Sequence, residues 1–165
     1  MRTFAVTAVL LLISALQAQP PKDTPKDDKL FDDISHKQIK ELVEKARKDG
    51  KLGLDGSDTK ANQIPQGTIL CYITSDKQYG KLKVVEYGYN LKLKWVTYAK
   101  DGSVVSKGDS LVVRGTWSCD LDKGVEGDED TAAKDDFWWE QKTETARSLT
   151  FSNGAVFTVF PVEKK

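Results

Sequence analysis

The hydrophobic pattern changes its period once along this chain, and the change limits the folds that the chain can adopt. From Gly67 onward, apolar and polar residues alternate in short segments, which is the period of half-buried β-strands. Gly, Asn and Asp residues separate these segments and mark turns. The predicted strands are 68–74, 81–87, 91–99, 104–106, 111–119, 137–141, 148–151 and 155–161.

Two dipeptides in the alternating region predict β-hairpins. Asp101-Gly102 and Asn153-Gly154 have the residue types that tight hairpin turns require. We expect the first to join strand 91–99 to the strand after it, and the second to join the last two strands. Because no crossover helices separate the strands, we predict a mainly β fold. It is an antiparallel β-sandwich or small β-barrel with one N-terminal accessory α-helix.

The first 18 residues have the features of a secretory signal peptide. Arg2 supplies a positive charge, residues 4–13 are apolar, and the small Ala18 precedes the expected cleavage point. The apolar run is shorter than the roughly 20 residues that span a bilayer. We therefore expect residues 1–18 to be cleaved and the mature chain to lack a membrane span. The expected location is secreted, periplasmic or in the cell envelope.

Between the signal peptide and the strands, the composition predicts a linker, a helix and a loop. Residues 19–34 hold three prolines and alternating Lys and Asp, which predicts a disordered linker. Ser35 and the glutamine three residues later have capping-box spacing, and an apolar stripe follows, so we predict a helix over 35–50. We assign residues 35–66 to this accessory helix and a loop, and residues 67–165 to the β domain.

Export changes the expected state of the two cysteines. Cys71 and Cys119 share their strand faces with apolar residues. An oxidising compartment favours a bond between two such thiols. We therefore predict a Cys71–Cys119 disulfide, with two free buried thiols as the alternative.

The charged residues exclude several functions. Lys and Arg together number 25, as do Asp and Glu, so the chain lacks the basic field that nucleic acid requires, and we expect no such partner. The single histidine, His36, falls in the first turn of the predicted helix, which does not suit a catalytic triad. Glu86 and Glu140 lie in predicted strands and are weak candidates for the paired carboxylates of a glycosidase. We predict no catalytic residue.

A row of lysines is predicted on the outer face of one hairpin, formed by Lys81, Lys83, Lys92 and Lys94. Charged residues of this kind keep a sheet soluble and discourage pairing at its edge. A surface that docks acidic polymers is the alternative interpretation.

An acidic loop follows the second cysteine. Its residues Asp120, Asp122, Glu126 and Asp128 offer the oxygen ligands that Ca²⁺ prefers, and we predict them as metal ligands. The EF-hand pattern is not met, because Gly124 occupies a position that needs an oxygen-bearing side chain. A looser Ca²⁺ site and an ion-free solvated loop both stay open, and no other cofactor is expected.

Two adjacent tryptophans occupy the predicted strand 137–141. Because neighbouring side chains of a strand point to opposite faces, one should enter the core while the other faces outward. An exposed Trp beside carboxylates is a common arrangement for stacking against a sugar ring. The predicted ligand-binding residues are Trp138, Trp139, Tyr87 and Tyr89. The alternative is that these aromatic side chains only fill the core.

Together these features predict an exported, non-enzymatic β-domain that acts as a binding or structural module for a glycan or a surface protein. A small secreted polysaccharide hydrolase and an inhibitor or accessory subunit of an extracellular enzyme are the alternatives. An exposed aromatic residue on a sheet face favours the binding module, whereas a cleft with two facing carboxylates favours the hydrolase.

Overall fold

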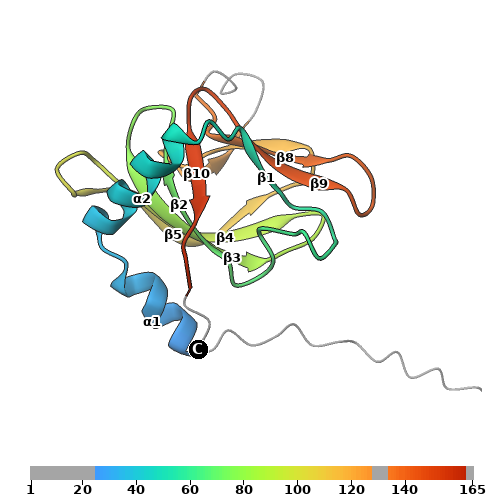
Figure 1. The fold of residues 1–165 in the computed structure, drawn as a ribbon, viewed down its shortest axis with the longest axis horizontal. Helices are drawn as coiled ribbons and strands as arrows, with labels where there is room; N and C mark the ends of the chain where they lie inside the picture. The colour runs from blue at the N-terminus through green and yellow to red at the C-terminus, as the bar shows by residue number, and fades with distance from the viewer. Residues whose placement is uncertain (1–24, 128–133, 163–165) are drawn as a thin grey trace, which may run out of the picture.

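Two five-stranded antiparallel sheets pack face to face in the computed structural model, which describes residues 25–127 and 134–162 (Figure 1). Sheet A has the strand order β1-β9-β8-β6-β7, and sheet B has the order β10-β2-β3-β4-β5. The predicted fold class is confirmed as a mainly β antiparallel sandwich, because the described strands form two separate sheets. The strands are β1 (Gly53–Asp55), β2 (Ile69–Ile73), β3 (Tyr79–Glu86), β4 (Leu91–Tyr98), β5 (Val104–Val113), β6 (Trp117–Asp120), β7 (Val125–Glu126), β8 (Phe137–Gln141), β9 (Arg147–Phe151) and β10 (Val156–Val159).

The alternation in the sequence places the main core between the two sheets. Leu91, Leu93 and Trp95 point inward from β4, while the residues between them are only half-buried. Phe137 and Trp139 enter the same core from β8 of sheet A. Burying each of these large apolar side chains contributes about 2 kcal/mol, so the cluster holds the two sheets together.

β4 and β5 form the hairpin that the sequence predicts. Gly102 has a φ of 89°, the left-handed conformation that a glycine adopts without strain. β5 continues without a break to Val113, so the predicted strand 104–106 and the first part of 111–119 belong to one element. The chain then turns at Thr116, with a φ of 68°, before β6 begins.

The predicted accessory helix is α2 (His36–Lys48), and its cap is the expected one. The Ser35 hydroxyl accepts a hydrogen bond from the Gln38 amide at 3.3 Å, and the Gln38 side chain accepts one from the Ser35 amide at 2.9 Å. Ile39 and Val43 are fully buried against the outer face of sheet B. The helix is therefore held by a conventional apolar stripe.

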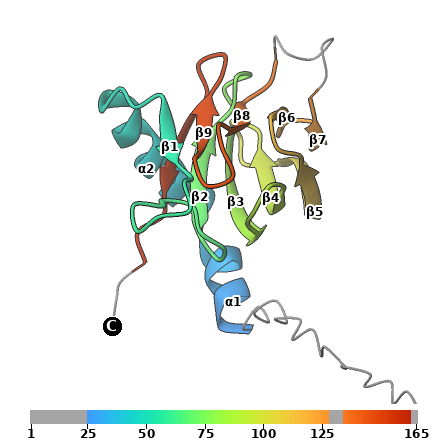
Figure 2. The same ribbon diagram turned by 90° about the vertical axis from the view of Figure 1, so that its right-hand side faces the viewer.

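A second helix, α1 (Pro25–Asp33), lies where the sequence predicts a disordered linker, and that prediction is wrong over these residues. Phe31 is fully buried against the outer face of sheet B, beside α2. In Figure 2, α1 lies below β2 and β3. The helix also covers Lys81 and Lys83, so part of the lysine row that was expected in solvent is buried. Composition alone did not predict α1, because the main partners of this helix are charged groups of the sheet and not other apolar residues nearby in the sequence.

The predicted hairpin at Asn153-Gly154 does not form. Both residues have a positive φ, 50° and 76°, so the tight turn itself is present. The two strands that it joins belong to different sheets, because β9 pairs with β8 and β1, whereas β10 pairs with β2. Leu149 and Phe157, one from each strand, face each other's sheets across the core. The local turn was predictable from the dipeptide, but the strand partner depended on which of the two sheets each strand joins.

The predicted disulfide is absent, and Cys71 and Cys119 are separate buried thiols. Cys119 faces the core between the two sheets, with Phe137 as a neighbour in the same cluster. Cys71 points to the opposite side of sheet B, into the layer beneath the helices. The prediction is wrong because β2 is buried on both faces, so burial alone did not show which face each sulfur occupies.

The predicted signal peptide, residues 1–18, lies outside the described residues and stays a prediction. Among the described helices, neither α1 nor α2 is long and apolar enough to cross a membrane.

Candidate functional site

The two outer faces of the sandwich differ in what covers them. α1 and α2 both pack on the outer face of sheet B, and neither of these described helices covers sheet A (Figure 1). β8 is the central strand of sheet A. Trp138 points outward from β8 and is 46% exposed. A large aromatic ring therefore lies at the middle of a sheet face that the helices leave open.

Hydroxyl and carboxylate groups surround this ring. Ser118 in β6 and Thr150 in β9 are the register partners of Trp138 on its two sides. Glu140, two residues further along β8, accepts a hydrogen bond from the Ser148 hydroxyl at 2.9 Å. An apolar ring with polar groups at its rim can stack against a sugar ring and hydrogen-bond to the sugar hydroxyls.

Trp139, the neighbouring residue, cannot take part in binding, so its assignment as a ligand residue is wrong. Its side chain is fully buried in the core, as strand alternation requires once Trp138 points outward. The indole Nε1 donates a hydrogen bond to the Tyr89 carbonyl at 3.0 Å, and the ring meets Tyr87 edge-on at 6.1 Å between centroids. The contacts of Trp139 therefore serve the core.

The two predicted tyrosines do not join Trp138 on the outer face of sheet A. The Tyr87 hydroxyl donates to the Gly56 carbonyl at 2.5 Å and accepts from Arg147 at 3.1 Å, which ties this half-buried ring to the loop after β1. Tyr89 is 63% exposed, but its ring lies against Gly115 at the end of β5. The predicted aromatic platform is thus reduced to one tryptophan.

Trp117 is another exposed tryptophan of sheet A, and the sequence argument had not named it as a ligand residue. It is 39% exposed at the start of β6, and the Arg114 guanidinium lies 4.0 Å from its ring centroid. Arg114 also pairs with Glu126 at 2.6 Å. Trp117 is the register partner of the buried Trp139, so alternation places it on the inner side of β6. Its exposure at the first residue of this strand therefore leaves no signal in a period-2 pattern.

A second cluster, the carboxylate cluster, consists of Asp120, Asp122 and Asp136. One carboxylate oxygen from each residue lies within 4.8 Å of the others. Asp136 Oδ1 accepts from the Ser75 amide and Oδ2 from the Leu121 amide, both at 2.7 Å. Asp120 ends β6 and Asp136 precedes β8, which pairs with β6, while Asp122 lies in the turn directly after β6, so the three side chains meet at one end of these strands.

The electrostatics of the carboxylate cluster favour retained protons or a bound cation. Burial raises the pKa of Asp136 to about 7, and burial likewise raises the pKa of Asp122 to about 6. Both carboxylate oxygens of Asp122 are shielded from solvent and make no hydrogen bond of normal geometry to a described residue. Asp120 is partly neutralised, since Lys123 Nζ lies 3.0 Å from its Oδ2.

The four predicted metal ligands separate into two groups. Asp120 and Asp122 belong to the carboxylate cluster, together with Asp136, which the sequence argument had not singled out. Glu126 is engaged by Arg114 instead. Asp128 lies outside the described residues. Asp136 could not be found from ligand spacing, because its place in the cluster depends on the pairing of β6 with β8.

The two thiols are unsuited to nucleophilic chemistry. Burial raises the pKa of Cys71 to about 12, and burial also raises the pKa of Cys119. Neither thiol forms a thiolate near neutral pH, and the thiolate is the reactive species.

Comparison with protein-family models, with curated proteins and with solved structures gives no match. The function must therefore be inferred from the geometry of the two sheet faces and the carboxylate cluster.

Proposed function

We propose that the protein is an exported, non-enzymatic β-sandwich module that binds a glycan on the outer face of sheet A. The observation that carries the proposal is Trp138, 46% exposed at the centre of that face. Tryptophan side chains are highly buried on average, so a ring that is exposed to this extent is consistent with a surface role. Exposure at a sheet centre, among polar neighbours, is what a stacking platform for a sugar requires.

A glycan fits this face better than a surface protein does. Trp138 is flanked by Ser118 and Thr150, whose hydroxyl groups do not extend the apolar surface of the ring. A stable protein interface usually needs a broad buried centre, on the order of 800 Å² for each partner. A single ring with a polar rim is closer to the size and chemistry of one or two sugar units.

Nothing in the described geometry favours the hydrolase alternative. Glu86 lies opposite the outward-facing Lys92 in sheet B, whereas Glu140 shares the outward face of β8 with Trp138, so the two weak candidates lie on opposite outer faces of the sandwich. Each also pairs with a lysine, Lys92 at 3.0 Å and Lys142 at 3.4 Å. A glycosidase needs two carboxyl groups about 5 to 10 Å apart on opposite sides of the scissile bond.

An array of immobilised oligosaccharides, probed with the purified protein, tests the proposal. The wild type and Trp117→Ala should bind the same spots, whereas Trp138→Ala should lose them. Trp117 is the matched control, because it is also an exposed tryptophan of sheet A but lies under Arg114 at the start of β6. A wild type that binds no glycan, or a Trp138→Ala variant that binds like the wild type, would refute the proposal.

The export part of the proposal has its own test. If residues 1–18 are a signal peptide, the protein recovered from outside the cytoplasm should begin at Gln19 when its N-terminus is sequenced. Recovery of the exported protein with Met1 or Arg2 still present would contradict this cleavage.

A further inference from the structure

Three lysines on the outer face of sheet B form a surface that α1 covers, and we call it the lysine seat. Lys81 and Lys83 in β3 are 3% and 1% exposed, and Lys94 in β4 is the register partner of Lys83. Lysines are almost never buried to this extent unless they are paired. Their depth in this structure depends on α1 lying over them.

The carbonyl end of α1 is bound by Lys81. Its Nζ donates hydrogen bonds to the carbonyl oxygens of Phe31, of Asp32 at 3.2 Å and of Ile34 at 2.9 Å. The last carbonyl groups of a helix lack partners of their own and carry partial negative charge. α1 has no basic residue in its last turn, so the sheet supplies the cation that this helix end needs.

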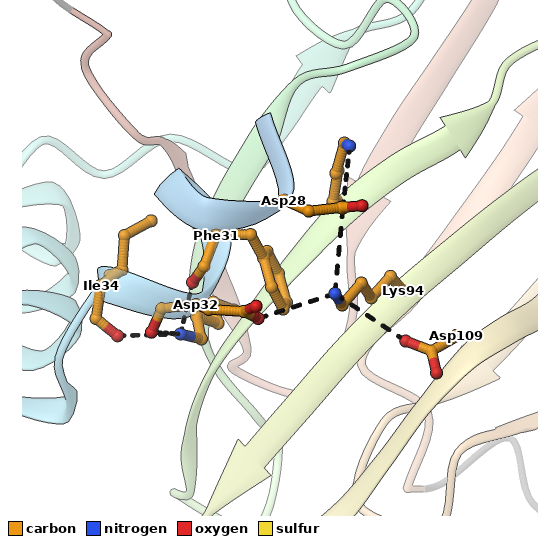
Figure 3. Close-up of polar contacts among 8 residues, drawn as sticks. Asp28, Phe31, Asp32, Ile34, Lys94 and Asp109 are labelled. Carbon is orange, nitrogen blue, oxygen red and sulfur yellow. Dashed lines mark hydrogen bonds and ion pairs between the residues drawn. The ribbon is translucent and has the colours of Figure 1, made fainter. Parts of the chain in front are cut away.

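The acidic side chains of α1 also face the lysine seat. Asp28 Oδ1 lies 3.3 Å from Lys83 Nζ and 3.8 Å from Lys94 Nζ. Asp32 Oδ1 lies 3.6 Å from Lys94 Nζ. Figure 3 shows Lys94 between these two aspartates of α1 and Asp109 of β5. The contact is therefore built on opposite charges.

One aromatic ring anchors the helix among these charges. Phe31 is fully buried, and the Nζ atoms of Lys81 and Lys94 lie 4.8 Å and 5.0 Å from its ring centroid. Both distances are within the range of a cation–π contact. A groove of about 520 Å³ runs alongside Phe31 and Lys94, on the side of β5.

We propose that the lysine seat is a binding site for an acidic peptide segment of a partner protein, a segment with one aromatic anchor, and that α1 is its built-in occupant. The contacts of α1 resemble those of a bound ligand. Its C-terminal end, two of its carboxylates and one aromatic ring all contact the three lysine ammonium groups. Charge complementarity selects an acidic partner, and the ring contacts select an aromatic residue within it. α1 is joined to α2 by a short connection, so its high effective concentration keeps the site closed until a partner displaces it.

Fluorescence anisotropy with a labelled peptide of residues 25–34 tests this proposal on the full chain. The receptor is a release variant, Asp28→Lys/Phe31→Ala/Asp32→Lys, which removes the anchors of its own α1. The release variant should bind the peptide at least about tenfold more tightly than the wild type, whose site is occupied in cis. Far-UV circular dichroism and the melting temperature establish that the release variant is folded.

Two matched controls define the site. Adding Lys94→Glu to the release variant should weaken peptide binding about tenfold or more, whereas adding Lys92→Glu should leave it unchanged. Lys92 is on the same strand, but among the described side chains it pairs with Glu86 rather than with one of α1. A peptide with alanine in place of its phenylalanine should also bind weakly. Equal loss from both lysine variants, or equal binding of both peptides, would mean only a general charge effect and would overturn the proposal.

Hydrogen exchange on the wild type gives an independent test. Amides of α1 should exchange through local release, faster than those of α2, because a displaceable occupant opens without unfolding the sandwich. Exchange of α1 as slow as that of α2 would contradict the proposal. So would a release variant that fails to fold, because a detachable occupant is not needed for folding.

Discussion

The two outer faces of this sandwich are built from similar strands, but helices cover one face and leave the other open. The face of sheet B is covered by two helices that bury lysines, a tyrosine and a row of apolar residues. The face of sheet A is left open by those helices and presents Trp138 to solvent. The main core lies between the two sheets, and the two described helices pack on sheet B, so they leave the outer face of sheet A accessible. Substitutions on the covered side should therefore affect stability, and those on the open face should affect binding.

The adjacent tryptophans of β8 give the sharpest form of this contrast. Trp139→Ala should lower the free energy of unfolding by about 4 kcal/mol, because it leaves a cavity in the core. Trp138→Ala should change it by no more than about 0.5 kcal/mol, as expected of a surface position. Urea unfolding of both variants measures the difference. A large loss for Trp138→Ala would mean that the ring belongs to the fold and would break the comparison.

The two helices on the covered face should themselves differ. Ile39→Ala should cost about 3 kcal/mol, since Ile39 anchors α2 through apolar packing. Phe31→Ala should cost only about 1 to 2 kcal/mol, because α1 can detach before the sandwich unfolds. Thermal or denaturant unfolding monitored by circular dichroism checks the order. Equal costs would indicate that α1 is as integral as α2.

The carboxylate cluster should make stability depend on pH in a defined direction. The folded pKa values of Asp122 and Asp136 are raised to about 6 and 7, so the folded protein binds more protons than the unfolded chain between pH 4 and 7. Stability should therefore fall as the pH rises through this window. Asp122→Asn should flatten the dependence of stability on pH and raise the free energy of unfolding at pH 7 by about 1 kcal/mol. This value is smaller than the full pKa shift would give, because the Asp122 side chain is only half-buried. Urea midpoints at several pH values measure it, and a wild-type profile that rises from pH 4 to 7 would contradict the assignment.

Calcium should produce the smallest effect on stability. If the carboxylate cluster holds Ca²⁺, adding the ion in place of a chelator at pH 7 should raise the melting temperature by about 2 °C. The shift should vanish in Asp122→Asn and persist in Asp58→Asn, an exposed aspartate outside the cluster. Differential scanning calorimetry measures the shift. Identical melting curves with the ion and with the chelator would contradict the metal prediction. Protonation would then be what reduces the negative charge of the carboxylate cluster.

Residues with a local signal were predictable from the sequence. The capping box at Ser35, the turn at Gly102 and the alternation along β4 each follow from contacts within a few residues, and all three predictions are confirmed. Within 137–141, alternation also required that one tryptophan face outward, but it did not show which one.

Features that depend on distant partners were not predictable. α1 is stable on this surface because Lys81 and Lys83 lie beneath it, and those residues are about 50 positions away along the chain. The sulfur of Cys71 faces the helices because of where β2 lies in sheet B. Neither feature can be predicted from amino-acid composition or from the period of the hydrophobic pattern, since both arise only when the two sheets assemble.

The most direct test of the open face as a binding surface is an amide nuclear magnetic resonance spectrum of the protein, titrated with the oligosaccharide that the array selects. We predict that the Trp138 indole signal and the amides of Ser118 and Thr150 shift together, while the amides of α1 and α2 stay in place. Shifts centred on the helices, or shifts that persist unchanged in Trp138→Ala, would contradict a glycan site on sheet A.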